Sequence, residues 1–257
     1  MSASGFSIAR TIMICAPRDT VFRYFTDSER FAAWWGAGSS IDPRPGGAVR
    51  IRYPNAVEAS GEVVEIAPPS RIVFTYGYEG EGKPIPPGGS RVTVELTAVA
   101  GGTRVALTHD CENVDPAVGL EHTQGWRYQM ALFANTVARE AQARAGERID
   151  AFLSAWNEKD APRRLAILED CATEDVLFRD AFSCTSGLLD LAAQLAAVQT
   201  FMPGMTLRRE GDVSQCQGTA VAGWIAKAED GAIRGQGKNV YELSPDGKIR
   251  QATGFWG

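Results

Sequence analysis

Apolar and polar residues alternate along much of the first half of the chain, which is typical of strands with one buried face. The alternation is clearest on both sides of Gly101-Gly102, a pair that predicts a hairpin. Two short helices are predicted at 18–25 and 28–35, the second with Ser28 as N-cap, and a long helix at 116–143. The predicted strands are 6–15, 48–53, 57–66, 71–78, 91–98 and 103–111. Between them, 79–90 lacks a periodic apolar signal and is predicted to be a mobile loop.

The second half mixes helices and strands in another order. Apolar residues at helical spacing predict a helix over 148–157, another after Pro162 and a third over 188–201. The predicted strands are 176–182, 206–213, 219–228, 234–243 and 248–256. A chain of 257 residues is long for one domain and comfortable for two. We therefore predict two α+β domains, at 1–145 and 146–257.

Composition narrows the classes of partner. The chain is 44% hydrophobic and 22% charged, as in ordinary globular proteins. Its net charge of -5 argues against nucleic acid, because phosphate binding needs a basic face. No apolar run is long enough to cross a bilayer, and no basic region followed by an apolar stretch opens the chain. We expect a cytoplasmic protein with neither a nucleic-acid nor a membrane partner.

The sequence has few residues and motifs of the kinds that bind metals or cofactors. The five cysteines are scattered, without a Cys-x-x-Cys spacing, and His109 and His122 are the two histidines. The sequence also has no glycine-rich phosphate-binding loop. We therefore expect no metal site, no disulfide framework and no cofactor.

The order strand, two short helices, antiparallel sheet and long helix is that of a helix-grip fold. Six motifs accompany this order, Ala16-Pro17-Arg18-Asp19-Thr20-Val21-Phe22, Trp34-Trp35-Gly36, Asp42-Pro43-Arg44-Pro45-Gly46-Gly47, Gly61-Glu62-Val63, Pro68-Pro69-Ser70-Arg71-Ile72-Val73 and His122-Thr123-Gln124-Gly125-Trp126. With them, region 5–143 resembles the Activator of Hsp90 ATPase homologue family, a branch of the Bet v 1/START-like (SRPBCC) superfamily. The resemblance implies a helix-grip domain with a cavity for a small apolar ligand.

The second half carries three further motifs, Phe152-Leu-Ser-Ala-Trp-Asn-Glu-Lys-Asp160, Val176-Leu-Phe-Arg-Asp180 and Tyr241-Glu-Leu-Ser-Pro-Asp-Gly-Lys-Ile249. With them, region 147–257 resembles the NTF2-like superfamily, which includes SnoaL-like polyketide cyclases and ketosteroid isomerase. The resemblance implies a cone-shaped α+β domain that works without a cofactor. Because such domains often pair through their sheets, it also predicts a homodimer.

In the first domain, the long helix lies across the expected cavity. Its Trp126, Met130 and Phe133 are candidate walls, although core residues would show the same spacing. His109 is in phase with apolar neighbours and is expected to face inward, and His122 is expected at the mouth. We find no nucleophile with a neighbouring base, so this domain is predicted to bind rather than to react.

The second domain offers a candidate base. Val176, Phe178 and Asp180 share one face of a strand, which places a carboxylate at the end of an apolar row. Loss of solvation makes such a carboxylate a stronger base. The alternative is a capping or ion-paired carboxylate beside Arg179.

The resemblance to ketosteroid isomerase assigns further roles. Asp180 matches the general base, and Asn239 matches the acidic oxyanion donor, with a side-chain amide that still donates. Phe152 replaces a hydrogen-bonding tyrosine, and Tyr241 is in phase with Asn239 as a second donor. The aromatic candidates for the cavity lining are Phe152, Trp156, Phe178, Trp224 and Phe255. Trp256 is expected to point the other way, and Trp224 fits a sheet contact equally well.

Three functions follow from these residues. The first is an enzyme that binds a small hydrophobic carbonyl compound and catalyses a cofactor-independent proton transfer, isomerisation or cyclisation. The second is a non-catalytic carrier or sensor of hydrophobic ligands. The third, implied by the name of the first family, is an Hsp90-type co-chaperone.

Overall fold

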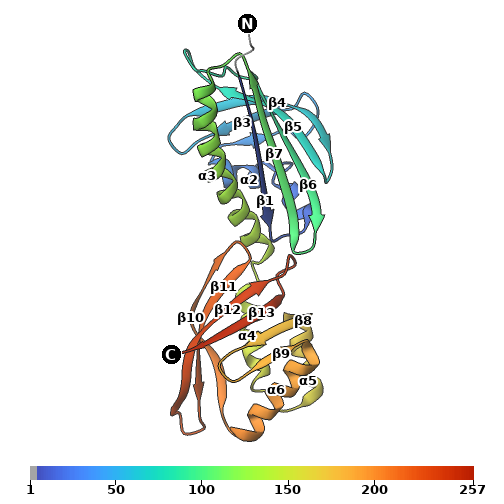
Figure 1. Cartoon of the computed structure of the whole chain (residues 1–257), viewed down its shortest axis with the longest axis vertical. Coiled ribbons are helices and arrows are strands. Elements are labelled where there is room, and N and C mark those ends of the chain that lie inside the picture. The colour runs from blue at the N-terminus through green and yellow to red at the C-terminus, as the bar shows by residue number, and fades with distance from the viewer. Residues whose placement is uncertain (1–4) are drawn as a thin grey trace. The chain divides into compact units, whose positions relative to one another are not determined.

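The computed structural model describes residues 5–257. The chain divides into two compact units, Met1–Ala138 and Arg139–Gly257, and each contains helices packed on a sheet (Figure 1). The predicted α+β class is therefore confirmed. The bounds of the helices are α1 Arg18–Arg23, α2 Ser28–Trp35, α3 Pro116–Ala141, α4 Ala145–Ala155, α5 Ala161–Cys171 and α6 Leu188–Phe201.

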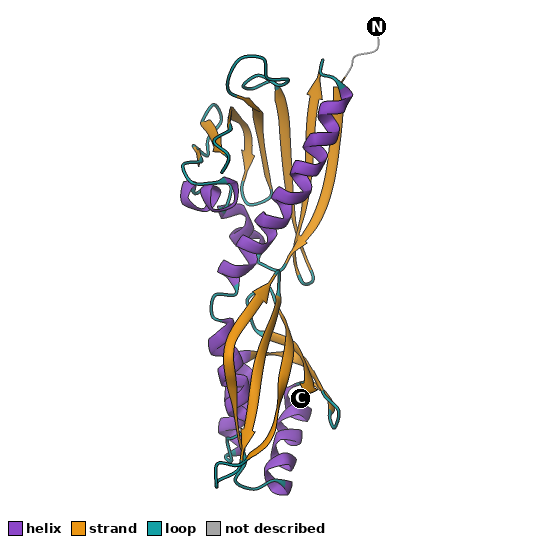
Figure 2. Ribbon diagram, turned by 90° about the vertical axis from the view of Figure 1, so that its left-hand side faces the viewer, coloured by secondary structure: helices purple, strands orange, loops and turns teal. Residues whose placement is uncertain are grey.

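The N-terminal unit is built on one antiparallel sheet with the order β1-β7-β6-β5-β4-β3-β2. The long helix α3 crosses one face of this sheet, as the predicted helix-grip fold requires (Figures 1 and 2). The strands are β1 Gly5–Ile14, β2 Ser40–Ile41, β3 Ala48–Arg52, β4 Glu58–Ala67, β5 Arg71–Tyr78, β6 Ser90–Val99 and β7 Gly102–Glu112.

An aromatic layer joins α3 to the two short helices. The Phe133 ring of α3 packs on Trp34 of α2, with ring centroids 4.6 Å apart, and on Phe25, at 5.3 Å. Phe133 and its neighbour Met130 are almost completely buried. Burial of each of these side chains removes a large apolar area from water, so the aromatic layer stabilises the packing of α2 against α3.

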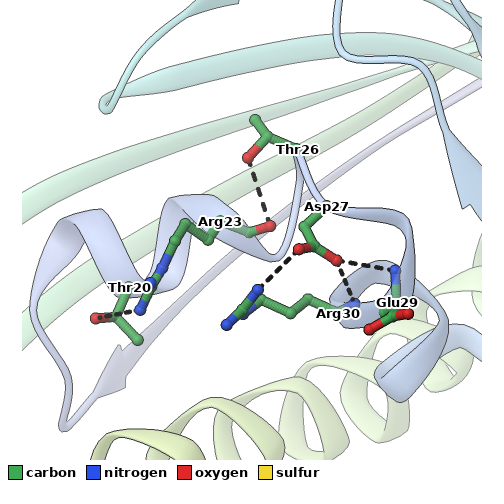
Figure 3. A network of polar contacts seen from close by, with 6 residues as sticks. All are labelled: Thr20, Arg23, Thr26, Asp27, Glu29 and Arg30. Carbon is green, nitrogen blue, oxygen red and sulfur yellow. Dashed lines mark hydrogen bonds and ion pairs between the residues drawn. The ribbon is translucent and has the colours of Figure 1, made fainter.

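The N-terminus of α2 is capped by Asp27, not by the expected Ser28 (Figure 3). The Asp27 carboxylate accepts hydrogen bonds from the backbone N–H groups of Glu29 and Arg30, at 2.9 and 3.1 Å. These bonds and the Arg30 guanidinium lower the pKa of Asp27. Ser28 instead exchanges hydrogen bonds with the backbone of Ile41.

The predicted loop over 79–90 has no helix or strand up to Gly89, and one buried side chain anchors it to the rest of the unit. Ile85 is fully buried and packs with Cys111 and Val114, and its carbonyl accepts a hydrogen bond from the N–H of Tyr78 at 2.8 Å. A single buried side chain does not recur at helical or strand spacing, so no periodic pattern in the sequence marks Ile85. The folded-back loop brings Lys83 into the wall of a cavity.

The C-terminal unit has a six-stranded sheet in the order β10-β11-β12-β13-β8-β9. Helices α4, α5 and α6 contribute Phe152, Leu168 and Leu195 to the core on one face (Figure 2). The strands are β8 Ala172–Arg179, β9 Cys184–Ser186, β10 Thr206–Cys216, β11 Thr219–Lys227, β12 Ile233–Leu243 and β13 Ile249–Trp256. This is the predicted NTF2-like arrangement.

One parallel pairing interrupts the antiparallel order. Strand β8 lies beside β13, with Phe178 opposite Ala252 and Arg179 opposite Thr253. The next residue along β8 is Asp180, and the next along β13 is Gly254. The pairing thus brings the candidate base to the last strand of the chain.

We predict that Ile85→Ala lowers the free energy of unfolding by about 2–5 kcal/mol, because it removes the buried anchor of the loop and leaves a cavity. Lys83→Ala, an exposed change in the same loop, serves as the control and is expected to stay within about 0.5 kcal/mol of the parent. Urea unfolding measures both. Equal stability of the Ile85 variant and the parent would contradict the anchoring role.

Candidate active site

A cavity of about 410 Å³ lies in the C-terminal unit. Most of its wall is apolar, and its aromatic side chains include Trp156, Phe178 and Trp224, the three that the sequence analysis selected and the structure brings together. The polar side chains in the wall are Asp180, Ser183, Gln194 and Asn239. A mainly apolar cavity with a few converging polar groups is the usual form of a small-molecule site.

Asp180 follows the end of β8 and is half-buried in the cavity wall. Its Oδ1 accepts a hydrogen bond from the backbone N–H of Phe182 at 2.8 Å, and its Oδ2 accepts one from the indole N–H of Trp256 at 3.3 Å. The neighbouring Arg179 donates to Gln251 instead. The carboxylate therefore caps the turn that follows it and also presents an acceptor to the cavity.

Asn239, on β12, is 5% exposed and also lines the cavity. Its Nδ2 donates to the hydroxyl of Tyr241 at 3.0 Å. Tyr241 is fully buried, which raises the pKa of its phenol and keeps it protonated. Because Tyr241 lies behind Asn239 and outside the cavity wall, it supports the amide and does not face a ligand, contrary to the expected role of a second donor.

Gly254 separates the two polar side chains. It pairs with Asn239 across the β12–β13 ladder. A Cβ on Gly254 would lie 3.1 Å from Cβ of Asp180 and 3.2 Å from Oδ1 of Asn239. Asp180 and Asn239 therefore flank the same point of the cavity wall.

Three aromatic predictions are wrong. Phe255 is 58% exposed and lies outside the cavity wall, whereas Trp256 lines the cavity. The reason is register: Gly254 lies opposite Asn239, so Gly254 and Trp256, two residues further along β13, face the cavity. Phe152 also lies outside the wall, fully buried in the core, with its ring centroid 6.0 Å from that of Tyr241.

The sequence analysis missed part of the rim. Phe182 and Met202 line the cavity, although both side chains are largely exposed. The Phe182 ring packs edge-on against Trp256, with centroids 5.2 Å apart, and Trp256 packs in the same manner on Trp224 at 4.9 Å. Both missed residues lie in turns, where neither helical nor strand periodicity marks a face.

The N-terminal unit has a cavity of its own, of about 440 Å³. His109, His122 and Trp126 line it, together with residues that the sequence analysis did not select, Trp35, Tyr53, Tyr76 and Tyr78. Met130 and Phe133, which were also expected as walls, belong to the core instead. Both are almost completely buried, and the Phe133 ring packs on Phe25 and on Trp34 of α2, as the alternative interpretation of the apolar stripe proposed.

Both nitrogens of each histidine are engaged. Nδ1 of His109 accepts from the indole N–H of Trp126 at 3.0 Å, so its Nε2–H donates to Ser90 at 2.8 Å. Burial, with His122 nearby, lowers the pKa of His109 to about 3. His122 donates through Nδ1 to the carbonyl of Val118 at 2.8 Å and accepts at Nε2 from Tyr78 at 3.3 Å. His109 is therefore a neutral structural side chain of the cavity wall.

Two broader features concern metals and membranes. Within residues 5–257, no group of three or more His, Cys, Asp or Glu side chains is arranged to hold a metal ion. None of the helices in that range is both long enough and apolar enough to span a membrane.

The two units are thus a helix-grip domain and an NTF2-like domain, each with its own cavity. Residues 15–138 match the family described as Activator of Hsp90 ATPase homolog 1-like protein. The N-terminal unit resembles this family, and the C-terminal unit has the NTF2-like fold described above. No curated protein matches the chain.

Three solved structures illustrate the similarity. A proposed isomerase of the SnoaL-like family from Agrobacterium tumefaciens shares 23% identity, with 46% of this chain and 98% of that chain covered and a TM-score of 0.42. An AHSA1-like protein from Rhizobium etli shares 26%, with 52% and 83% covered and a TM-score of 0.41. The Aha1 dimer from Colwellia psychrerythraea shares 17%, with 49% and 90% covered and a TM-score of 0.42.

We predict that acid destabilises the protein through His109. Its pKa is about 3 when folded and 6.5 in the unperturbed state, so between these values the unfolded chain binds more protons. The stabilisation is complete above pH 6.5 and is lost as the pH falls toward 3, at about 1.4 kcal/mol per pH unit. Urea unfolding at several pH values from 7.5 to 5 measures the free energy of unfolding of the parent and of His109→Gln. The difference between the two proteins should become smaller as the pH falls. Parallel pH profiles would refute this role.

We also predict that Trp256→Ala weakens binding of the apolar ketone 2-acetylnaphthalene by about tenfold, because it removes one aromatic wall. Phe255→Ala is the matched control on the adjacent residue and should bind the ketone as the parent does. Equilibrium dialysis measures both affinities. A loss confined to the Phe255 variant would show that the opposite face of β13 forms the site.

Proposed function

We propose that the C-terminal unit binds a small, mainly apolar carbonyl compound and catalyses proton transfer at the carbon beside the carbonyl. The observation that carries this proposal is the placement of Asp180 and Asn239 on either side of Gly254, in the wall of one apolar cavity. A base and a polar amide at the same point of a cavity match the two demands of enolisation, which are removal of a proton and stabilisation of an oxygen anion.

In the proposed step, the Asp180 carboxylate takes a proton from the α-carbon of the ligand. The electron pair of the broken C–H bond forms a C=C bond, and the carbonyl electrons move to oxygen as an enolate. The Asn239 amide nitrogen carries two N–H groups, of which one donates to Tyr241. Oδ1 of the amide lies toward Gly254, so the proposal assigns the remaining N–H of Nδ2 to the enolate oxygen from beside that position. Return of the proton from Asp180 to a different carbon would complete an isomerisation.

The hydrogen bonds of Asp180 support its role as an oriented base. Two donors, the N–H of Phe182 and the indole of Trp256, hold the two carboxylate oxygens. None of the salt bridges found among residues 5–257 includes Asp180. The carboxylate is thus oriented by two neutral donors and not by an arginine or lysine.

A second candidate function is ligand carriage by the N-terminal unit. It is favoured by the cavity of about 440 Å³, whose histidines have both ring nitrogens engaged in hydrogen bonds and so lack a free base. In this function the N-terminal unit holds an apolar ligand unchanged. The co-chaperone hypothesis rests on the name of the matching family alone.

We predict that the parent protein exchanges the methyl protons of 2-acetylnaphthalene for deuterium in D₂O faster than Asp180→Asn does. Loss of a general base lowers such rates by about 10²–10⁴-fold. Proton NMR follows the methyl signal. Arg179→Gln, which changes the adjacent exposed residue, is the control and should retain the parent rate. Equal exchange by the parent and the Asp180 variant would refute the proposed base.

A further inference from the structure

We infer that the C-terminal cavity also binds organic ammonium ions in which a primary amine is joined to a flat aromatic body. The ammonium group would lie against the Asp180 carboxylate and the side-chain oxygen of Asn239, and the body would lie against the aromatic wall. The inference goes beyond the proposed function, because it concerns a ligand without a carbonyl group and needs no proton transfer.

The charge of the cavity wall carries the first step. Among the residues that the structure describes, Asp180 is the one ionisable side chain in this wall, which contains no arginine, lysine or histidine. The carboxylate is half-buried, and the residues around it are mainly apolar. A negative charge in such surroundings loses part of its hydration, and a cation restores the lost interaction. The cavity is therefore complementary in charge to a cationic ligand.

A second acceptor lies beside the carboxylate. Nδ2 of Asn239 donates to the Tyr241 hydroxyl at 3.0 Å, so the amide turns its oxygen in another direction. Oδ1 of Asn239 lies 3.2 Å from the position of a Cβ on Gly254, and Cβ of Asp180 lies 3.1 Å from the same position. Within residues 5–257, no donor forms a hydrogen bond with this Oδ1. A primary ammonium group has three N–H donors, which can reach both acceptors at once.

The aromatic wall suits the body of such a ligand. Its rings are those of Trp156, Phe178, Phe182, Trp224 and Trp256. The indole N–H of Trp256 donates to the Asp180 carboxylate at 3.3 Å, so an indole ring lies directly beside the negative charge. Aromatic rings attract cations through the electron density of their faces, and tryptophan does so most strongly. A cation therefore loses less free energy on leaving water here than in an aliphatic cavity.

These features also define which ligands are excluded. An anion would face Asp180 with a charge of the same sign, so it is repelled. A neutral alcohol donates one hydrogen bond but brings no charge. A quaternary ammonium ion brings the charge but has no N–H for either acceptor. The class that satisfies the charge, both acceptors and the aromatic wall is the primary arylalkyl ammonium ion.

The test compares four ligands that share a naphthalene ring. They are 2-naphthylmethylammonium, its N,N,N-trimethyl derivative, the neutral 2-naphthalenemethanol and the anionic 2-naphthoate. The proteins are the parent, Asp180→Asn and Asp175→Asn. Asp175 is an exposed residue of the same strand, so its variant removes an equal charge outside the cavity. Equilibrium dialysis at neutral pH measures affinity, and circular dichroism with urea unfolding verifies the fold.

We expect the parent to bind 2-naphthylmethylammonium about tenfold more tightly than the alcohol, and more tightly than the trimethyl derivative or the naphthoate. Asp180→Asn should lose about tenfold in affinity for the primary ammonium and keep its affinity for the alcohol. Asp175→Asn should bind all four ligands as the parent does. The inference is overturned if a folded Asp180→Asn binds the ammonium as tightly as the parent. If that variant does not fold, equal affinity of the parent for the ammonium and the alcohol overturns it.

The outcomes also separate this inference from the proposed function. If the parent fails to exchange the methyl protons of 2-acetylnaphthalene, the proposed base is refuted. The preference for the ammonium ion and its loss in Asp180→Asn would still support the inference. If the parent exchanges these protons but binds the ammonium no more tightly than the alcohol, the inference fails and the proposed function stands.

Discussion

The candidate site depends on the parallel pairing of β8 with β13. Asp180 and Gly254 are distant in the sequence, and this ladder alone places them side by side. The same pairing brings the indole of Trp256 to the carboxylate. Because backbone hydrogen bonds fix the register residue by residue, a slip of one position would turn the base away from the cavity. The geometry of the site therefore follows from the sheet.

The two units use the same architectural principle for different chemistry. Each covers one face of a sheet with helices and leaves a cavity that the core does not fill. In the N-terminal unit, indole, hydroxyl and carbonyl groups satisfy the two histidines, and burial keeps His109 neutral. In the C-terminal unit, a carboxylate and an amide remain directed at the cavity. The first arrangement suits binding, and the second suits proton transfer.

Polar groups are few in the C-terminal cavity, and their partners define their roles. Tyr241 is buried and protonated, so it serves to hold the Asn239 amide. The mainly apolar wall offers these two groups few other hydrogen-bond partners. At its rim, the exposed ring of Phe182 packs on Trp256.

The local spacing of apolar and polar residues was sufficient to predict most helices and strands and the strand face on which Asp180 lies. Alternation along 176–180 shows that Phe178 and Asp180 share a face, and this property needs only the geometry of a single strand. The helical stripe through Trp126, Met130 and Phe133 was equally visible. The sequence did not show which of these residues line the cavity and which belong to the core. That division depends on where Trp34 of α2 packs.

The spacing of apolar residues sets the periodicity of each element, and hence which residues share a face. Which face meets the cavity depends on how the strands pair in the folded protein. For β13, that choice depends on its pairing with β12, where the register shifts between Glu242 and Leu243, so that Trp256 rather than Phe255 lines the site. Such a shift is set by hydrogen bonds between strands, and a single strand carries no record of its partner.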